Sequence, residues 1–274
     1  MKVLYKERGV ASVVGTLFAL LLAVTLLSLF MTQYVPTYMH SSEAQRDMNL
    51  LSQYSQIKTN IDLLISTGQL NYTIYSVLTL GANGIPFFGP SSPSSLRIAS
   101  VSSGSPLLYI NFTSQGIPVS ILSGGLIDSY AYNAYYVQER IAYFDGFVIR
   151  ENVNQNSSSI YVGTEFTIAN VNGNYYITVT VYNIIGSNYY YVGTDSKNVG
   201  VSVLAIVKNT YLTSKNVYFN ATGEFGNVIL NWYYNQAYSF FNDPYVSLKN
   251  NSLMFSNVAQ ITLTDAYVYA QVST

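Results

Sequence analysis

Residues 6–31 read KERGVASVVGTLFALLLAVTLLSLFM, and this stretch decides the architecture of the chain. From Val10 to Met31 there is no charged residue, and Leu, Val, Ala and Phe dominate. As a helix rising about 1.5 Å per residue, such a run is long enough to cross the roughly 30 Å hydrocarbon core of a bilayer. The sequence therefore predicts a membrane-spanning helix.

Charged residues on either side of this run predict its orientation. Lys2, Lys6 and Arg8 precede it, whereas the next basic residue is Arg46. Because flanks rich in Lys and Arg stay on the cytoplasmic side, we expect a cell-membrane precursor with its N-terminus in the cytoplasm. The chain after Met31 is then expected outside the cell.

The length of the run argues against a conventional secretory signal. Such a signal has an apolar region of about 7–15 residues and a small-x-small cleavage site, and residues 32–44, TQYVPTYMHSSEA, offer no such site. Two alternatives remain. One is an uncleaved membrane anchor, and the other is a filament subunit whose basic leader is removed before assembly.

The segment ERGVASVVGTLFALLLAVTLLSLF (7–30) resembles the class III signal of archaeal type IV pilin-like proteins, which include adhesive pilins and archaellins. In that family, a membrane-embedded prepilin peptidase removes a basic leader that ends in Gly or Ala. The resemblance implies cleavage between Gly9 and Val10, with the apolar helix left on the mature protein. SVVGTL (12–17) resembles the segment that commonly follows, although Val13 stands where proline is usual. The resemblance also implies association with identical or other pilin subunits through this helix.

Four segments follow from these observations: a basic leader (1–9), a hydrophobic transmembrane or filament-core helix (10–35), an amphipathic helix (36–68) and a β-rich extracellular head domain (69–274). Pro36 lacks an N–H group and is expected to kink or break the helix. Ser42 with Gln45 fits a capping box for the second helix, and Gly68 fits its end.

The second helix has one predicted apolar face, which is expected to dock on the head. A juxtamembrane stalk is the alternative. The apolar positions are Ala44, Met48, Leu51, Ile57, Ile61 and Leu64. The positions expected mostly off this face are Gln45, Arg46, Asp47, Gln53 and Lys58.

After Asn71 the pattern changes to short alternating runs between Gly, Asn, Ser and Pro, which is typical of an all-β domain. We therefore expect an α+β chain: a long hydrophobic helix, then a large sandwich-like head. Asn172-Gly173 and Asp145-Gly146 are predicted hairpin turns. Further strands are expected at Leu107–Thr113, Val201–Val207, Gln260–Leu263 and Ala266–Val272.

Two other segments of the head have distinct compositions. Residues 82–105 are rich in Gly, Pro and Ser and are expected to form a loop. Residues 226–243 predict a short helix that ends before Pro244. The side chains expected to point inward are Trp232, Tyr233, Ala237 and Phe240 or Phe241. For Trp232, packing in the core is favoured over stacking against a sugar.

The composition of the chain argues against several classes of function. Only 9% of the 274 residues are charged and the net charge is -1, so no basic stripe exists for nucleic acid. There is no cysteine, and the single histidine, His40, has no second histidine for a metal cluster. We find no catalytic motif and expect no enzyme activity, metal or cofactor. The densest acidic group is expected at solvated strand edges and turns: Asp128, Glu139, Asp145, Glu151 and Glu165.

Polarity comes instead from Tyr, Asn, Ser and Thr. Twenty-seven tyrosines provide hydrogen-bonding surface without ionised carboxylates, which suits an acidic exterior or adhesion. Five Asn-x-Ser/Thr sequons are candidates for glycosylation in an exported glycoprotein: Asn71, Asn111, Asn156, Asn220 and Asn250.

Together these features favour a pilin-like subunit of an archaeal surface filament that mediates adhesion or surface contact. Its large head is compatible with a minor or tip subunit. The alternative is a monomeric, membrane-anchored protein that binds an extracellular ligand such as a surface glycan. The two differ in whether the leader is removed and the helices assemble.

Overall fold

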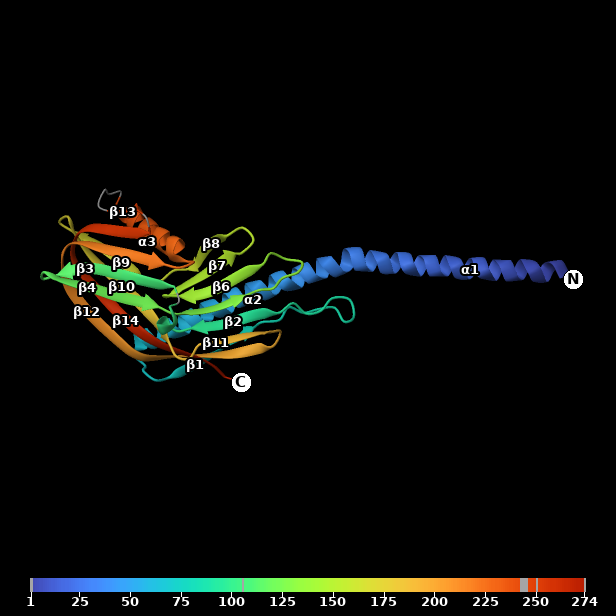
Figure 1. The fold of residues 1–274 in the computed structure, drawn as a ribbon, viewed down its shortest axis with the longest axis horizontal. Coiled ribbons are helices and arrows are strands. Elements are labelled where there is room, and N and C mark those ends of the chain that lie inside the picture. Colours follow the sequence, from blue (N-terminus) through green and yellow to red (C-terminus); the bar gives the residue numbers. More distant parts are fainter. Residues whose placement is uncertain (1, 105, 242–245, 250, 274) are drawn as a thin grey trace.

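A computed structural model describes residues 2–104, 106–241, 246–249 and 251–273 (Figure 1). One long N-terminal helix projects as a rod from a head made largely of β-strands. This arrangement confirms the predicted order of a long apolar helix followed by a large all-β region.

Of the kink or break predicted at Pro36, the break is wrong, because the rod is continuous. Helix α1 (Lys2–Leu29) passes through the π-helical segment η1 (Phe30–Tyr34) into α2 (Val35–Thr67). At the junction the N–H of Val35 donates to the carbonyl of Phe30, five residues earlier. Proline lacks a donor and crowds the carbonyl four residues before it, and the wider π turn accommodates it at the start of α2.

The predicted capping box is also wrong, because Ser42 and Gln45 lie inside α2. Ser42 Oγ donates to the carbonyl of Asn83 at 2.8 Å, and Gln45 Nε2 donates to Asn49 Oδ1 at 3.0 Å. The predicted end is confirmed. Gly68 has a φ of 64°, and its N–H donates to the carbonyl of Ile65, as in a left-handed C-cap.

The buried face of α2 differs in part from the prediction. Leu51, Ile57, Ile61 and Leu64 are buried as expected, but Met48 is 51% exposed and Ala44 is half-buried. Three charged residues predicted off this face, Arg46, Asp47 and Lys58, are buried. These charged residues belong to the one buried stripe of α2, whose members recur every three or four residues. Ion pairs or loop carbonyls replace water around their charges.

The larger sheet has eight strands in the described residues, in the order β1-β12-β3-β4-β10-β14-β13, with β9 also paired to β10 and β12 to β14. Most pairs are antiparallel, whereas β14 runs parallel to β10. Its strands are β1 (Thr73–Thr79), β3 (Leu107–Ser114), β4 (Ile117–Gly124), β9 (Phe166–Val171), β10 (Asn174–Ile185), β12 (Ser196–Thr222), β13 (Val246–Lys249) and β14 (Ser252–Ser273).

The smaller sheet is antiparallel, in the order β11-β2-β5-β6-β7-β8. Its strands are β2 (Ser94–Ala99), β5 (Leu126–Tyr130), β6 (Glu139–Phe144), β7 (Phe147–Asn152), β8 (Ser157–Val162) and β11 (Tyr189–Gly193). A short 3-10 turn, η2 (Val101–Ser103), precedes β3.

Several predicted elements are confirmed and others need correction. Asn172-Gly173 joins β9 to β10 and Asp145-Gly146 joins β6 to β7, with positive φ at all four residues. The strand predicted from Leu107 matches β3. The other three predicted strands are parts of the much longer β12 and β14, and the predicted loop at 82–105 contains β2.

Two apolar cores fill the described part of the head. One lies where α2 packs against both sheets and includes Leu50, Tyr54 and Ile57. The other is built from the far halves of both sheets and from α3 (Gly226–Phe241), through Tyr233 and Ala237. The predicted helix is therefore confirmed. Pro244 and the side chains of Phe240 and Phe241 lie outside the described part.

Candidate functional sites

The first candidate site is the apolar shaft, which we define as Val13–Leu29. Its large apolar side chains are between 46% and 65% exposed, on every side of the helix. Among the described residues, this is the one helix long and apolar enough to cross a membrane, in a span that runs on to Thr67. A helix that is apolar all round requires lipid or other helices around it.

Hydroxyl groups on the shaft suit such surroundings. Thr16 Oγ1 donates to the carbonyl of Val13 at 2.9 Å, and Thr25 Oγ1 donates to that of Leu21 at 2.6 Å. Their hydrogen bonds are thus satisfied within the helix. The shaft therefore presents almost no polar group that requires water.

The predicted cleavage bond, Gly9–Val10, lies within α1; the side chains of residues 1–12 lie outside the described part. Glycine is about 1 kcal/mol less favourable than alanine inside a helix. Gly9 therefore lowers the helix propensity at the predicted peptidase site, as Gly15 does within the shaft.

A buried polar collar, Glu43, Arg46, Asp47 and Asn133, holds α2 in the head. Both carboxylate oxygens of Glu43 accept backbone N–H groups from the loop after β5: Ala134 at 2.9 Å, Tyr135 at 2.8 Å and Tyr136 at 2.7 Å. Ser92 Oγ also donates to Glu43. Glu43 is fully buried, so these donors replace its hydration.

Arg46 completes the collar. Its Nη1 donates to the carbonyls of Leu80 at 3.0 Å and Ser92 at 3.1 Å, and its Nε donates to Asp47 at 2.7 Å. Asn133 accepts from Arg46 and donates to Asp47. Burial raises the pKa of Asp47 to about 6, although Arg46 acts in the opposite direction. The collar is a structural clamp between the rod and two loops.

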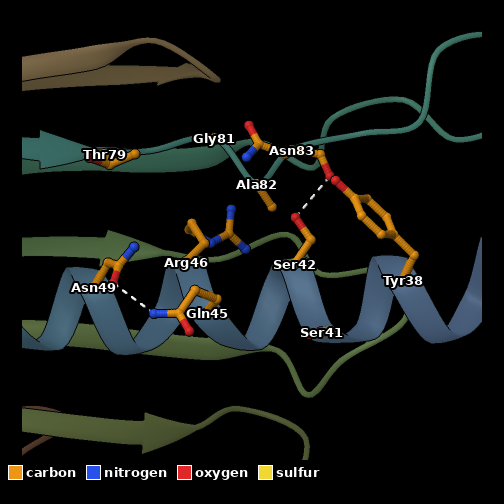
Figure 2. A pocket seen from close by; sticks show the side chains of 10 residues that line it. All are labelled: Tyr38, Ser41, Ser42, Gln45, Arg46, Asn49, Thr79, Gly81, Ala82 and Asn83. Atoms are coloured by element: carbon orange, nitrogen blue, oxygen red, sulfur yellow. Dashed lines mark hydrogen bonds between the residues drawn. The ribbon is translucent and has the colours of Figure 1, made fainter.

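An open groove of about 340 Å³ lies beside this clamp (Figure 2). Tyr38, Ser42 and Asn49 line it from α2, and Gly81 and Asn83 face them from the segment after β1. Among the described residues that line the groove, Arg46 alone is charged, and its guanidinium donates to loop carbonyls. The groove therefore offers hydroxyl and amide contacts rather than acid–base chemistry.

The second candidate site is the charged cleft, an open hollow of about 510 Å³ on the smaller sheet. Its charged residues come from β2, β5, β6, β7 and the segment before α3: Arg97, Asp128, Arg140, Glu151 and Glu224. Arg97 donates to both oxygens of Asp128, at 2.8 and 3.0 Å, and Arg140 donates to the same carboxylate at 2.7 Å. Arg140 also pairs with Glu151 and Glu224.

Tyrosine rings flank these charges. The rings of Tyr130 and Tyr132 lie 4.7 Å apart, and the hydroxyls of Tyr132 and Tyr190 are 3.5 Å apart. Tyr190 is 64% exposed and so presents a ring face to solvent. Flat rings beside oriented carboxylates and guanidiniums suit a polyhydroxylated ligand.

The acidic residues flagged in the sequence therefore separate into different roles. Asp128 and Glu151 meet in the charged cleft, whereas Glu139 pairs with Arg150 nearby. The predicted solvated positions are wrong for Asp145, which is fully buried in its turn, and for Asp128 and Glu139, which are also buried. Glu165 is exposed as predicted. These groupings join strands distant in sequence, so spacing alone did not reveal them.

The asparagines of the described sequons differ in how exposed they are. Asn71 and Asn156 are exposed and have positive φ, Asn156 in the turn between β7 and β8 and also on the rim of the charged cleft. Asn111 and Asn220 are half-buried in strands β3 and β12. Asn250 lies outside the described residues.

Two other flagged residues have packing contacts. His40 lies edge-on to Tyr136, with ring centroids 5.0 Å apart, and the described chain holds no group of three or more His, Cys, Asp or Glu suited to a metal. Trp232 packs edge-on against Phe147 at 5.1 Å. It is half-buried against the second core, which confirms its predicted packing role.

Comparisons with known proteins found no matching family model, and no match among curated proteins or solved structures. The apolar helix is compatible with membrane anchoring or with a signal sequence. The resemblance of residues 7–30 to the pilin signal stays a prediction.

Proposed function

We propose that this chain is a type IV pilin-like subunit of an archaeal surface filament. Prepilin peptidase would remove residues 1–9, and the helix from Val10 would leave the membrane to pack with identical or other pilin subunits. The observation that carries this proposal is the apolar shaft. It is exposed on all sides and runs without interruption into α2, whose buried face packs into the head.

Removal of the leader fits this order of events. Burial of apolar surface contributes about 25 cal/mol per Å², so the shaft stays in lipid until other apolar helices replace the lipid. Burying the cations of Lys2, Lys6 and Arg8 without partners would cost several kcal/mol each. An unprocessed chain is therefore a poor filament subunit.

The head would supply adhesion or surface contact through its tyrosine and amide groups. Exposed tyrosines include Tyr72, Tyr75, Tyr161, Tyr190 and Tyr238. A head of this size fits a minor or tip subunit, which supplies a contact surface once per filament rather than along its whole length.

Cleavage at Gly9 tests the proposal most directly. Mass spectrometry of sheared extracellular fibres should find a mature chain that begins at Val10. Gly9→Leu should block processing and remove the protein from fibres, whereas Gly9→Ala, which keeps a small residue, should preserve both. An unprocessed native chain found only as a membrane monomer would overturn the proposal.

A second function is favoured by the charged cleft. A monomeric, membrane-anchored chain could bind a surface glycan between Tyr190 and the guanidiniums of Arg97 and Arg140. In a glycan-array measurement on the full chain in detergent, Tyr190→Ala should reduce binding at least tenfold. The matched control, Tyr238→Ala, removes an exposed ring from α3 and should leave binding unchanged.

A further inference from the structure

The segment between β1 and β2 runs back along the rod, towards the N-terminal end (Figure 1). At its tip, Ile85 and Gly89 form a closed turn: the N–H of Ile85 donates to the carbonyl of Gly89 at 2.7 Å, and the reverse bond measures 2.9 Å. Pro86, Phe87 and Phe88 form the end of this turn. We call residues 84–90 the aromatic loop.

The aromatic loop is held against the rod. The rings of Phe88 and Phe30 meet edge to face, with centroids 5.1 Å apart. Gly89 lies so close to α2 that an added Cβ would come within 3.3 Å of Met39 Sδ and 3.6 Å of Val35 Cγ1. These contacts hold the aromatic loop beside the junction of α1 and α2.

Phe87 has no favourable place in water. Its side chain is fully exposed, and its φ is 67°, a conformation that bulky residues rarely adopt. A strained backbone that presents an unpacked phenyl ring to solvent is unfavourable twice over. An apolar medium beyond the protein would remove the second of these costs.

The position of the aromatic loop along the rod indicates which apolar medium Phe87 would contact. Phe30 is the next-to-last residue of the apolar run, which ends at Met31 before the polar residues Thr32 and Gln33, so its ring marks the outer edge of the predicted span. Tyr34 and Tyr38 continue a ladder from Phe30, with successive ring centroids 4.9 and 6.2 Å apart. Aromatic residues gather at this boundary between hydrocarbon and headgroups.

We propose that the aromatic loop is a second membrane anchor, which inserts Phe87 into the outer-leaflet interface beside the helix. The segment from residue 63 to residue 96 contains no charged residue that would resist this insertion. Lipid is favoured over a second copy of the chain because the loop lies where the apolar run ends. The inference rests on the membrane-spanning step of the proposed function, but not on filament assembly.

Because the chain contains no cysteine, a single introduced cysteine can be labelled at a chosen position. Single variants of the full chain, Phe87→Cys, Leu20→Cys and Ile117→Cys, would carry an environment-sensitive NBD fluorophore in phosphatidylcholine vesicles. Leu20 lies in the apolar shaft, and Ile117 begins β4, at the end of the head away from the rod (Figure 1); both are exposed. Leu20 is the positive control and Ile117 the negative control.

The expected result is blue-shifted emission at positions 87 and 20, quenched at least twofold by doxyl-labelled lipid, with neither effect at position 117. Quenching at position 20 but not at 87 would overturn the loop anchor and leave the membrane span intact. No quenching at position 20 would overturn the span and the loop anchor with it. A blue shift at position 87 that grows only with the protein-to-lipid ratio would indicate a second copy and would also overturn the inference.

Discussion

At the scale of single residues, Asp145 combines a turn position with complete burial. Its φ is 47°, Ser123 Oγ and the N–H of Tyr182 donate to its Oδ1 at 2.7 and 2.9 Å, and within the described structure its Oδ2 has no partner. Burial, with a smaller contribution from Asp265, raises the pKa of Asp145 to about 7. The folded state therefore favours the protonated carboxyl.

This shift predicts that the protein is more stable in mild acid. A carboxyl with a raised folded-state pKa contributes stability below its ordinary pKa of 3.8, and this contribution is lost as the pH rises through about 7. The raised pKa of Asp47 contributes stability in the same way, and this contribution is lost as the pH rises through about 6. The melting temperature should therefore rise as the pH is lowered from 8 to 5.

The variant Asp145→Asn isolates the effect. Asparagine keeps the positive-φ turn before Gly146, so the variant should melt higher than the wild type at pH 8 and depend less on pH. Asp195→Asn, at an exposed position, should leave the profile unchanged. A wild-type melting temperature that falls steeply between pH 8 and pH 5 would contradict this prediction and the acid-adapted surface expected from the composition.

Glu43 gives a second prediction at this scale. Glu43→Ala would leave the N–H groups of Ala134, Tyr135 and Tyr136 without their acceptor. Unpaired buried groups cost about 1–3 kcal/mol each, so the free energy of unfolding should fall by about 3 kcal/mol or more. Amide hydrogen exchange at 134–136 should accelerate. Gln45→Ala, two residues along α2 and exposed, should change neither quantity.

At the scale of elements, local chemistry made part of the fold predictable. Asn172-Gly173, Asp145-Gly146 and Gly68 need positive φ, and their residue types adopt it readily. By contrast, Ser42 resembles a helix cap, yet η1 carries the rod past Pro36 and the hydroxyl bonds Asn83 instead. The π turn shifts the backbone bond of Val35 to the carbonyl of Phe30, and no residue type from Phe30 to Tyr34 signals that shift.

Strand lengths were less predictable because they are set by pairing partners. β12 continues for 27 residues because β1 pairs with its first half and β3 with its second, while β14 lies along nearly its whole length. β2 was missed in a Ser- and Pro-rich segment. Its Leu96 and Ile98 pack on α2, and its Arg97 pairs with Asp128.

The corrected face of α2 gives a prediction of its own. Ile57 is fully buried between the sheets, whereas Met48 is half-exposed despite its place in the sequence pattern. Ile57→Ala should therefore lower the free energy of unfolding by about 2–5 kcal/mol, and Met48→Ala by no more than about 0.5 kcal/mol. Chemical denaturation of both variants checks the difference. Equal losses would mean that the helix is rotated from its described orientation.

At the scale of the whole molecule, the candidate sites differ in how far the sequence could reveal them. The shaft is contiguous, so composition alone predicted it. The charged cleft joins Arg97, Asp128, Arg140 and Glu224 across several strands and a loop, and only the sheet order brings them together. The collar was missed because Glu43, Arg46 and Asp47 resemble an ordinary solvated helix face until two loops enclose them.

The division between shaft and head makes a final prediction possible. Because the shaft is exposed throughout, a chain beginning at Thr32 should lose only minor contacts, such as that between Phe30 and Phe88. Its melting temperature should stay within a few degrees of the full chain, and its binding to vesicles should fall to the weak contribution of the aromatic loop.

A chain beginning at Gln69 should behave differently. It would lack α2, whose side chains Leu50, Leu51, Tyr54, Ile57, Ile61 and Leu64 fill one of the two cores. Losing even one such side chain costs about 2–5 kcal/mol, so losing all six would match or exceed the roughly 5–15 kcal/mol that stabilises a typical domain. Calorimetry should show no cooperative transition for this fragment. A sharp transition would mean that the strands hold the head without α2, and that the rod is attached to the head rather than built into it.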